Sequence, residues 1–166
     1  MIRGTNSGDL HMGHESSERD GKSEPSCSVE AASAERRGQL ARNWLTSVEV
    51  AKRFAIDDQD VAREMNQLRG AGTVLAVYWE MDGGSWRYPE WQFGKDGQPL
   101  PFLAEIIGVL RESGLFLDAQ GMSTGWGELE WFMTRHALLG AFTPIEVLQT
   151  DPCSVLRAAE QEFYSA

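Results

Sequence analysis

The sequence has no apolar run that could cross a membrane, and it has very few cysteines. No stretch approaches the roughly 18 consecutive apolar residues of a transmembrane helix. The amino-terminal residues also lack the apolar segment of a secretory signal peptide. Cys27 and Cys153 lie far apart and cannot form a disulfide framework. These absences predict a cytoplasmic protein in a reducing environment.

Motifs for nucleotide, metal and cofactor binding are also missing. The sequence contains no P-loop, no GxGxxG string and no Cys/His spacing typical of a metal site. We therefore expect no cofactor, no metal and no enzymatic activity.

One string of residues does match a catalytic motif. Residues 121–125 read G-M-S-T-G, the pattern of a nucleophile elbow around Ser123. The elbow needs a preceding strand, for which residues 115–117 are the only candidate, and a later histidine, which only His136 supplies. The chain is too short for the parallel sheet that presents such a serine. We expect instead that Ser123 or Thr124 caps the next helix and that His136 lies at a helix end.

Positive charge is scarce and unevenly distributed. The net charge is −10, of which −8 falls in residues 73–166. Such a surface repels phosphate groups and favours a basic protein partner. Residues 44–72 carry only −1, so nucleic-acid binding stays open for that segment.

Large apolar residues are rare in the first 43 positions, which are rich in Gly, Ser, Glu and Arg. Such a segment cannot bury enough surface to offset the entropy of ordering. We expect residues 1–43 to be a disordered tail, transiently helical over 28–42, in which residues 1–12 look vector-derived. Folded sequence then begins at Trp44, with one part over residues 44–93 and a helical domain over 94–166.

Residues 46–69 have the outline of a helix-turn-helix. Thr46 or Ser47 can cap a first helix, and a second is expected over 59–69 with Val61, Met65 and Leu68 buried. The string L-T-S-x-E-V-A-x-x-F-x-I at 45–56 resembles the opening of excisionase/MerR-like winged helices. In that resemblance the second helix reads the DNA groove, although it also carries acidic residues. The groove-reading residues would be Gln59, Arg63, Asn66, Gln67 and Arg69.

Residues 73–88 alternate as expected for a β-hairpin with a turn at 82–84, which would be the wing. The aromatic run at 88–93 is expected to bury this hairpin against later helices. Residues 100–113 form an amphipathic helix that ends at Gly114. The predicted fold is mainly α with one β-hairpin (α+β): a winged-helix-like module followed by a small helical bundle.

Three short helices are expected in residues 126–160. The face that begins at Trp126 includes Leu129, Phe132 and Met133. The dipeptides at 143–144 and 151–152 each place a capping residue before a proline, which suits a helix start.

The same segment resembles the C-terminal toxin-binding domain of Xre/MbcA/ParS-type antitoxins. In that family a Trp-containing helix leads to an L-x-G-x-x-P corner and then to a short D-P helix. The residues that carry the resemblance are Trp126, Trp131, Leu139, Gly140, Thr143, Pro144, Asp151 and Pro152.

The resemblance implies a cytoplasmic, dimeric antitoxin that neutralises a cognate toxin, often a RES-domain enzyme, and it leaves DNA-binding autoregulation open. Because the C-terminus of such relatives can enter the toxin, the expected toxin contacts are Glu160, Glu162, Phe163 and Tyr164. The alternatives are a transcriptional regulator whose C-terminal domain only dimerises, or a protein–protein adaptor.

Overall fold

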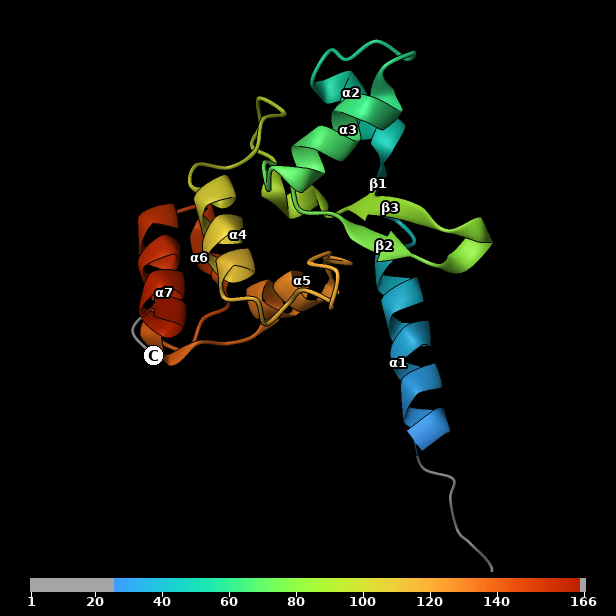
Figure 1. Cartoon of the computed structure of the whole chain (residues 1–166). Helices are drawn as coiled ribbons and strands as arrows, with labels where there is room; N and C mark the ends of the chain where they lie inside the picture. Colours follow the sequence, from blue (N-terminus) through green and yellow to red (C-terminus); the bar gives the residue numbers. More distant parts are fainter. Residues whose placement is uncertain (1–25, 165–166) are drawn as a thin grey trace, which may run out of the picture.

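The computed structural model describes residues 26–164, so the expectations for residues 1–25 lie outside the described part of the chain. The helices are α1 (Ser26–Ala41), α2 (Ser47–Arg53), α3 (Val61–Gly70), α4 (Leu103–Glu112), α5 (Trp126–Met133), α6 (Pro144–Leu148) and α7 (Pro152–Tyr164). The strands are β1 (Leu45–Thr46), β2 (Val77–Trp79) and β3 (Ser85–Tyr88). Short 3₁₀ turns occupy Met81–Gly83, Glu90–Gln92 and Ala137–Leu139. The expected α+β class is therefore confirmed, with the α2–α3 module above a bundle of α4 to α7 (Figure 1). No helix in residues 26–164 is both long and apolar enough to cross a membrane.

Helix α1 contradicts the expectation that residues up to 43 are disordered. It runs from Ser26 to Ala41, and Ala41 is fully buried in the main core. Near its end, a Cβ on Gly38 would lie 3.7 Å from the indole nitrogen of Trp79. The guanidinium of Arg37 lies 5.8 Å from the ring of Trp126. The prediction of disorder failed because α1 contacts the core through small residues, Gly38 and Ala41, rather than through large apolar ones.

The sheet has three antiparallel strands in the order β1-β3-β2. The predicted hairpin is confirmed, with Val77 opposite Arg87 and Trp79 opposite Ser85. Strand β1 was not predicted, and it pairs Leu45 with Tyr88 on the other side of β3. A two-residue strand is too short to produce an alternating pattern.

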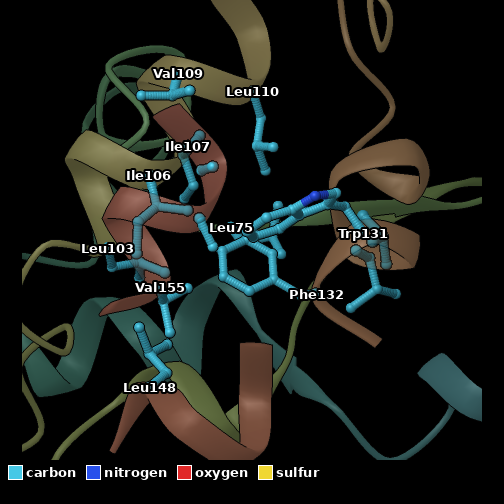
Figure 2. Packing of buried hydrophobic residues seen from close by; sticks show 14 of the residues in the cluster. Leu75, Leu103, Ile106, Ile107, Val109, Leu110, Trp131, Phe132, Leu148 and Val155 are labelled. Atoms are coloured by element: carbon cyan, nitrogen blue, oxygen red, sulfur yellow. The ribbon is translucent and has the colours of Figure 1, made fainter. Parts of the chain in front are cut away.

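Residues 74–77 divide their side chains between two apolar cores. Val74 and Ala76 belong to the smaller core under α2 and α3, while Leu75 and Val77 belong to the larger core. This is the expected two-residue alternation of an extended segment. The larger core joins α1, β2 and the four C-terminal helices, and Figure 2 shows Leu75 beside Phe132 within it. The winged-helix-like module and the bundle are thus joined by one extended segment.

Gln92 is a fully buried amide that holds this segment in place. Its Oε1 accepts from the Leu75 backbone N–H at 2.7 Å, and its Nε2 donates to the Leu75 carbonyl at 2.8 Å. Nε2 also donates to the Pro89 carbonyl at 2.9 Å. The Gln92 side chain therefore takes the place of a strand neighbour for Leu75, so these buried polar groups are paired. The aromatic run around it packs as expected, with the Trp91 and Phe132 rings 5.1 Å apart.

The expected helix starts are confirmed for α2, α6 and α7. Thr46 and Glu49 form a capping box on α2, and Thr143 and Glu146 form another on α6. Asp151 accepts from the Ser154 N–H at the start of α7. Other boundaries differ: α4 begins at Leu103 because Phe102 has a φ of 62°. Met133, expected on a buried face, is 44% exposed, because α5 turns that position outward.

We expect Thr143→Ala to lower the free energy of unfolding by about 1 kcal/mol, because α6 loses its cap. Hydrogen bonds from the Thr143 N–H and hydroxyl hold the pKa of Glu146 below its ordinary value. The stabilisation linked to this shift is present above the ordinary carboxyl pKa and is lost as the pH falls through the lowered one. Denaturant titration and NMR titration of Glu146 measure both effects. Thr143→Ser is the control, since its hydroxyl keeps the cap, and equal losses in the two variants would contradict the assignment.

Candidate nucleic-acid interface

The helix-turn-helix is built by two short helices that share the smaller core. Val50 and Ala51 of α2 and Met65 of α3 are almost completely buried there. The turn between the helices passes through Ala55, whose φ of 53° reverses the chain. Val61 and Leu68, expected to be buried, are half-buried at the edge of this core. Because one side of α3 is fixed by Met65, the other side is presented to solvent.

The exposed side of α3 carries most of the residues predicted to read DNA. Gln59, Arg63, Asn66 and Gln67 are exposed, while Arg69 is half-buried. Gln59 precedes the helix, in the turn that leads into it. The structure therefore exposes four of the predicted residues, and helical spacing puts Arg63, Asn66 and Gln67 on the solvent side of α3 with Arg69 at its edge.

Arg63 is not a free cation. Its guanidinium lies 2.9 Å from the Asp60 carboxylate and 3.0 Å from the Glu64 carboxylate. The pairs are exposed, so each contributes little to stability. They nevertheless place negative charge beside the one cation at the centre of the exposed face, which lowers its attraction for phosphate.

Arg69 joins α3 to the wing. Its guanidinium lies 3.9 Å from the centre of the Trp86 ring, and its Nη2 donates to Asn66 Oδ1 at 2.8 Å. Trp86 in turn packs edge-on against Tyr78, with ring centres 5.3 Å apart. We call these three residues the Arg69–Trp86–Tyr78 row. It extends the surface of α3 onto strands β2 and β3.

Sequence reasoning had assigned no binding role to Trp86 or Tyr78. Because Tyr78 and Trp86 are register partners in the hairpin, the strand pairing puts them on one face. The alternation of side chains along the two strands of the hairpin was the sequence signal that could have placed Tyr78 and Trp86 on one face. A surface hollow of about 660 Å³ lies where the row meets α3, lined by Ser47, Asp58, Val61, Arg63, Asn66 and Trp86, among others.

The residues predicted to contact a toxin fall into two groups. Phe163 packs inward, 5.8 Å from the Phe116 ring centre, and Glu162 accepts from Trp131 Nε1 at 3.0 Å. Glu160 and Tyr164 are exposed. The hydroxyl of Tyr164 donates to the Glu112 carboxylate, which raises the pKa of Tyr164. Phe163 packs into the bundle, and the carboxylate of Glu162, although exposed, is bonded to Trp131, so the free contact surface at this end is smaller than expected.

The residues of the G-x-S-x-G string have a structural role. Ser123 Oγ donates to Glu128 at 2.7 Å and accepts from the Gly125 N–H at 2.8 Å. No strand forms at residues 115–117, and Gly125, not Ser123 or Thr124, is the N-cap of α5. His136 lies beyond the end of α5, with its Nε2 3.0 Å from the Trp131 carbonyl oxygen, as expected for a helix-end histidine. Within residues 26–164 no cluster of His, Cys, Asp or Glu is arranged to hold a metal.

Comparisons with known proteins support the fold only. No protein-family model matches the sequence. No curated protein matches it significantly. Among solved structures, the NMR structure of Rv2175c is similar, with a TM-score of 0.54 and 20% sequence identity. The match covers 73% of this chain and 81% of that one. At this identity the similarity establishes a shared architecture for most of the chain.

Proposed function

We propose that the protein is a DNA-binding protein that reads sequence with α3 and contacts the adjacent backbone with its wing. The observation that carries this proposal is the exposed face of α3, where Arg63 and Asn66 line a hollow together with Arg69 and Trp86, and where Gln67 is also exposed. A helix with its opposite side fixed in a core, followed by a two-stranded wing, has the dimensions to enter a major groove.

The exposed side chains favour adenine-containing sites. Glutamine and asparagine amides can both accept from adenine N6 and donate to N7. Gln67 is exposed near the end of α3, and the Asn66 NH₂ group is not used in the bond that its Oδ1 accepts from Arg69. Because Arg63 is already paired, α3 is expected to gain little from phosphate contacts of its own and to depend on these amides.

Selection of duplexes from a random-sequence pool is the direct test. We expect enrichment of an A·T-containing site, and a binding loss of about 5- to 30-fold in Gln67→Ala, because one bidentate contact is removed. Gln161→Ala is the matched control, since Gln161 is also exposed but lies on α7. Failure to enrich any duplex at low salt would refute the proposal.

Asp60→Asn is expected to strengthen DNA binding. The substitution removes one of the two carboxylates that pair with Arg63, the one 2.9 Å from its guanidinium, so that the negative charge beside Arg63 falls and its attraction for a phosphate rises. Affinity should rise severalfold, and its dependence on salt should become steeper by about one counterion. Fluorescence anisotropy over a range of salt concentrations measures both. Asp118→Asn, which makes the same charge change in a loop outside the module, is the control.

A second candidate is an antitoxin-like role for the C-terminal bundle, which would bind a cognate RES-type toxin. The observation in its favour is a pair of exposed apolar side chains that flank Gly140 in the chain, Leu138 at 48% and Phe142 at 54%. Exposed apolar groups that lie close together are typical of protein-binding surfaces. Co-expression with the product of the adjacent gene, comparing the unaltered chain with Phe142→Asp, tests this role. Neutralisation that survives the substitution would argue against this surface.

A further inference from the structure

Helix α1 has an exposed stripe that no other part of the described chain covers. Residues 29, 33, 36 and 40 follow a four-three-four spacing, which aligns Val29, Ser33, Arg36 and Leu40 along one side of the helix. Val29 is 66% exposed and Leu40 is 41% exposed. The side that contacts the body of the protein carries Gly38 and Ala41 instead. Figure 1 shows that most of α1 projects away from the rest of the fold.

The stripe forms one wall of a groove. The groove has a volume of about 480 Å³, and α5 provides its second wall, with Trp126, Glu130 and Met133. Met133 is exposed there although it is a large apolar residue. Isolated helices of this length are marginal in water, so a helix with only one end anchored gains stability from a partner.

We propose that α1 pairs with α1 of a second copy of this chain in antiparallel orientation. In an antiparallel pair of helices the same flank of each helix meets its equivalent. Glu30 and Arg37 are seven residues apart and therefore lie on one flank of α1, beside the stripe. Antiparallel pairing brings Glu30 next to Arg37 of the second copy, whose guanidinium also lies 5.8 Å from the Trp126 ring of its own chain, and the two-fold axis repeats that ion pair.

The residues of the stripe also favour the antiparallel orientation. Antiparallel packing places Val29 against Leu40 of the second copy and Arg36 against Ser33. Parallel packing would place Arg36 against Arg36 of the second copy and leave Glu30 without a cation. The repulsion between the like charges therefore disfavours the parallel orientation. The groove is lined by Arg36 and Arg37 of α1 and by Glu130 of α5, so it presents charges of both signs to an incoming helix that also carries both. Charge complementarity thus identifies a second copy as the occupant of the groove.

This interface is small, so the dimer should dissociate at accessible concentrations. A stripe of two large apolar residues and one repeated ion pair falls at the low end of specific interfaces, which predicts a Kd on the order of 1–100 µM. The inference does not depend on DNA binding, because no residue of α3 or the wing takes part in it.

Charge reversal on the full chain tests the pairing, with sedimentation equilibrium as the measurement. Glu30→Arg and Arg37→Glu are each expected to weaken the dimer about tenfold or more, because each creates two like-charge contacts. The double variant exchanges the charges and should restore the original Kd. Glu35→Arg makes the same charge change at a position off the stripe and its flank, and it should leave the Kd unchanged.

Three results would overturn the inference. One is a chain that stays monomeric up to about 1 mM, about ten times the weakest expected Kd, which would mean that the groove is bare or filled from within the same chain. Another is a dimer that tolerates both single reversals. The third is a double variant as weak as the singles. Circular dichroism spectra of every variant, recorded well below the Kd, show whether the monomer fold is retained.

Discussion

Gly125→Ala is expected to lower the free energy of unfolding by more than about 4 kcal/mol, enough to unfold much of a domain of ordinary stability. A Cβ at this position would lie 1.8 Å from the Ala76 carbonyl oxygen and 2.8 Å from the Ala76 carbonyl carbon. Both are backbone atoms of the extended segment that separates the two cores. The φ of 80° at Gly125 adds strain for any residue with a side chain.

The clash at Gly125 has no easy route of relief. The preceding carbonyl, that of Thr124, accepts from the Tyr78 N–H at 2.8 Å, so the loop is tied to the start of the hairpin. Gly125 itself donates its N–H to Ser123 Oγ. Moving the loop outward would break these bonds and also shift the start of α5.

Gly121→Ala separates the clash from the backbone strain. Gly121 has a similar φ of 74°, but a Cβ there meets no atom within 4 Å. Gly121→Ala should therefore lower the free energy of unfolding by about 1 kcal/mol, which is the ordinary cost of a side chain in the left-handed region. Urea unfolding followed by circular dichroism measures both variants. Similar losses in the two would mean that the contact between Gly125 and Ala76 is not tight in solution.

The elements that the sequence predicted well are those with local causes. The capping boxes at Thr46 and Thr143 arise from residues three positions apart, and the alternation at 74–79 arises from neighbours two apart. Such signals need no knowledge of the rest of the chain. This explains why the helix starts and the hairpin were found, while β1, whose pairing depends on distant Tyr88, was not.

The features that the sequence did not predict, helix α1 and the buried Gln92, have non-local causes. Helix α1 packs on the main core through Ala41, with Gly38 beside Trp79, and such small residues give little hydropathy signal. Gln92 reads as a surface amide, yet it is fully buried because Leu75 lacks a strand neighbour on that side. These contacts join residues 17 to 41 positions apart, and no periodic pattern encodes them.

In the candidate nucleic-acid interface, too, the sequence predicted the features with local causes and missed those with non-local causes. Helical periodicity was enough to place Arg63, Asn66 and Gln67 on the solvent side of α3. It could not show that Arg63 is paired with Asp60 or that Arg69 lies on Trp86, because side-chain partners depend on how α3 meets the wing. At the other end of the chain, Phe163 looked like a free aromatic anchor until its contact with Phe116 was visible.

Glu128→Ala is expected to cost about 3–5 kcal/mol of unfolding free energy. Glu128 is fully buried and lies 3.2 Å from Arg111 Nε. The Arg111 side chain is only 20% exposed, so removing the carboxylate leaves a largely buried cation without its counter-ion. The Ser123 hydroxyl loses its acceptor in the same step.

The consequences should extend to α3. Arg111 Nη1 donates to the Arg69 carbonyl at 2.8 Å and to the Gly70 carbonyl at 3.3 Å, where it satisfies the C-terminal end of that helix. Without Glu128 the guanidinium is free to turn toward solvent and release these carbonyls. Amide hydrogen exchange should therefore increase at the end of α3 as well as in α5.

Glu130→Ala is the control, because Glu130 is an exposed carboxylate two residues away on the same helix, and its loss should stay within about 0.5 kcal/mol. The double variant with Arg111→Met and Glu128→Leu tests whether the contact between Arg111 and α3 contributes to stability. Replacing both charges removes the uncompensated cation, so stability should recover in part. Recovery should not be complete, because methionine cannot donate to the α3 carbonyls. Full recovery would show that the contact between Arg111 and α3 contributes nothing to stability.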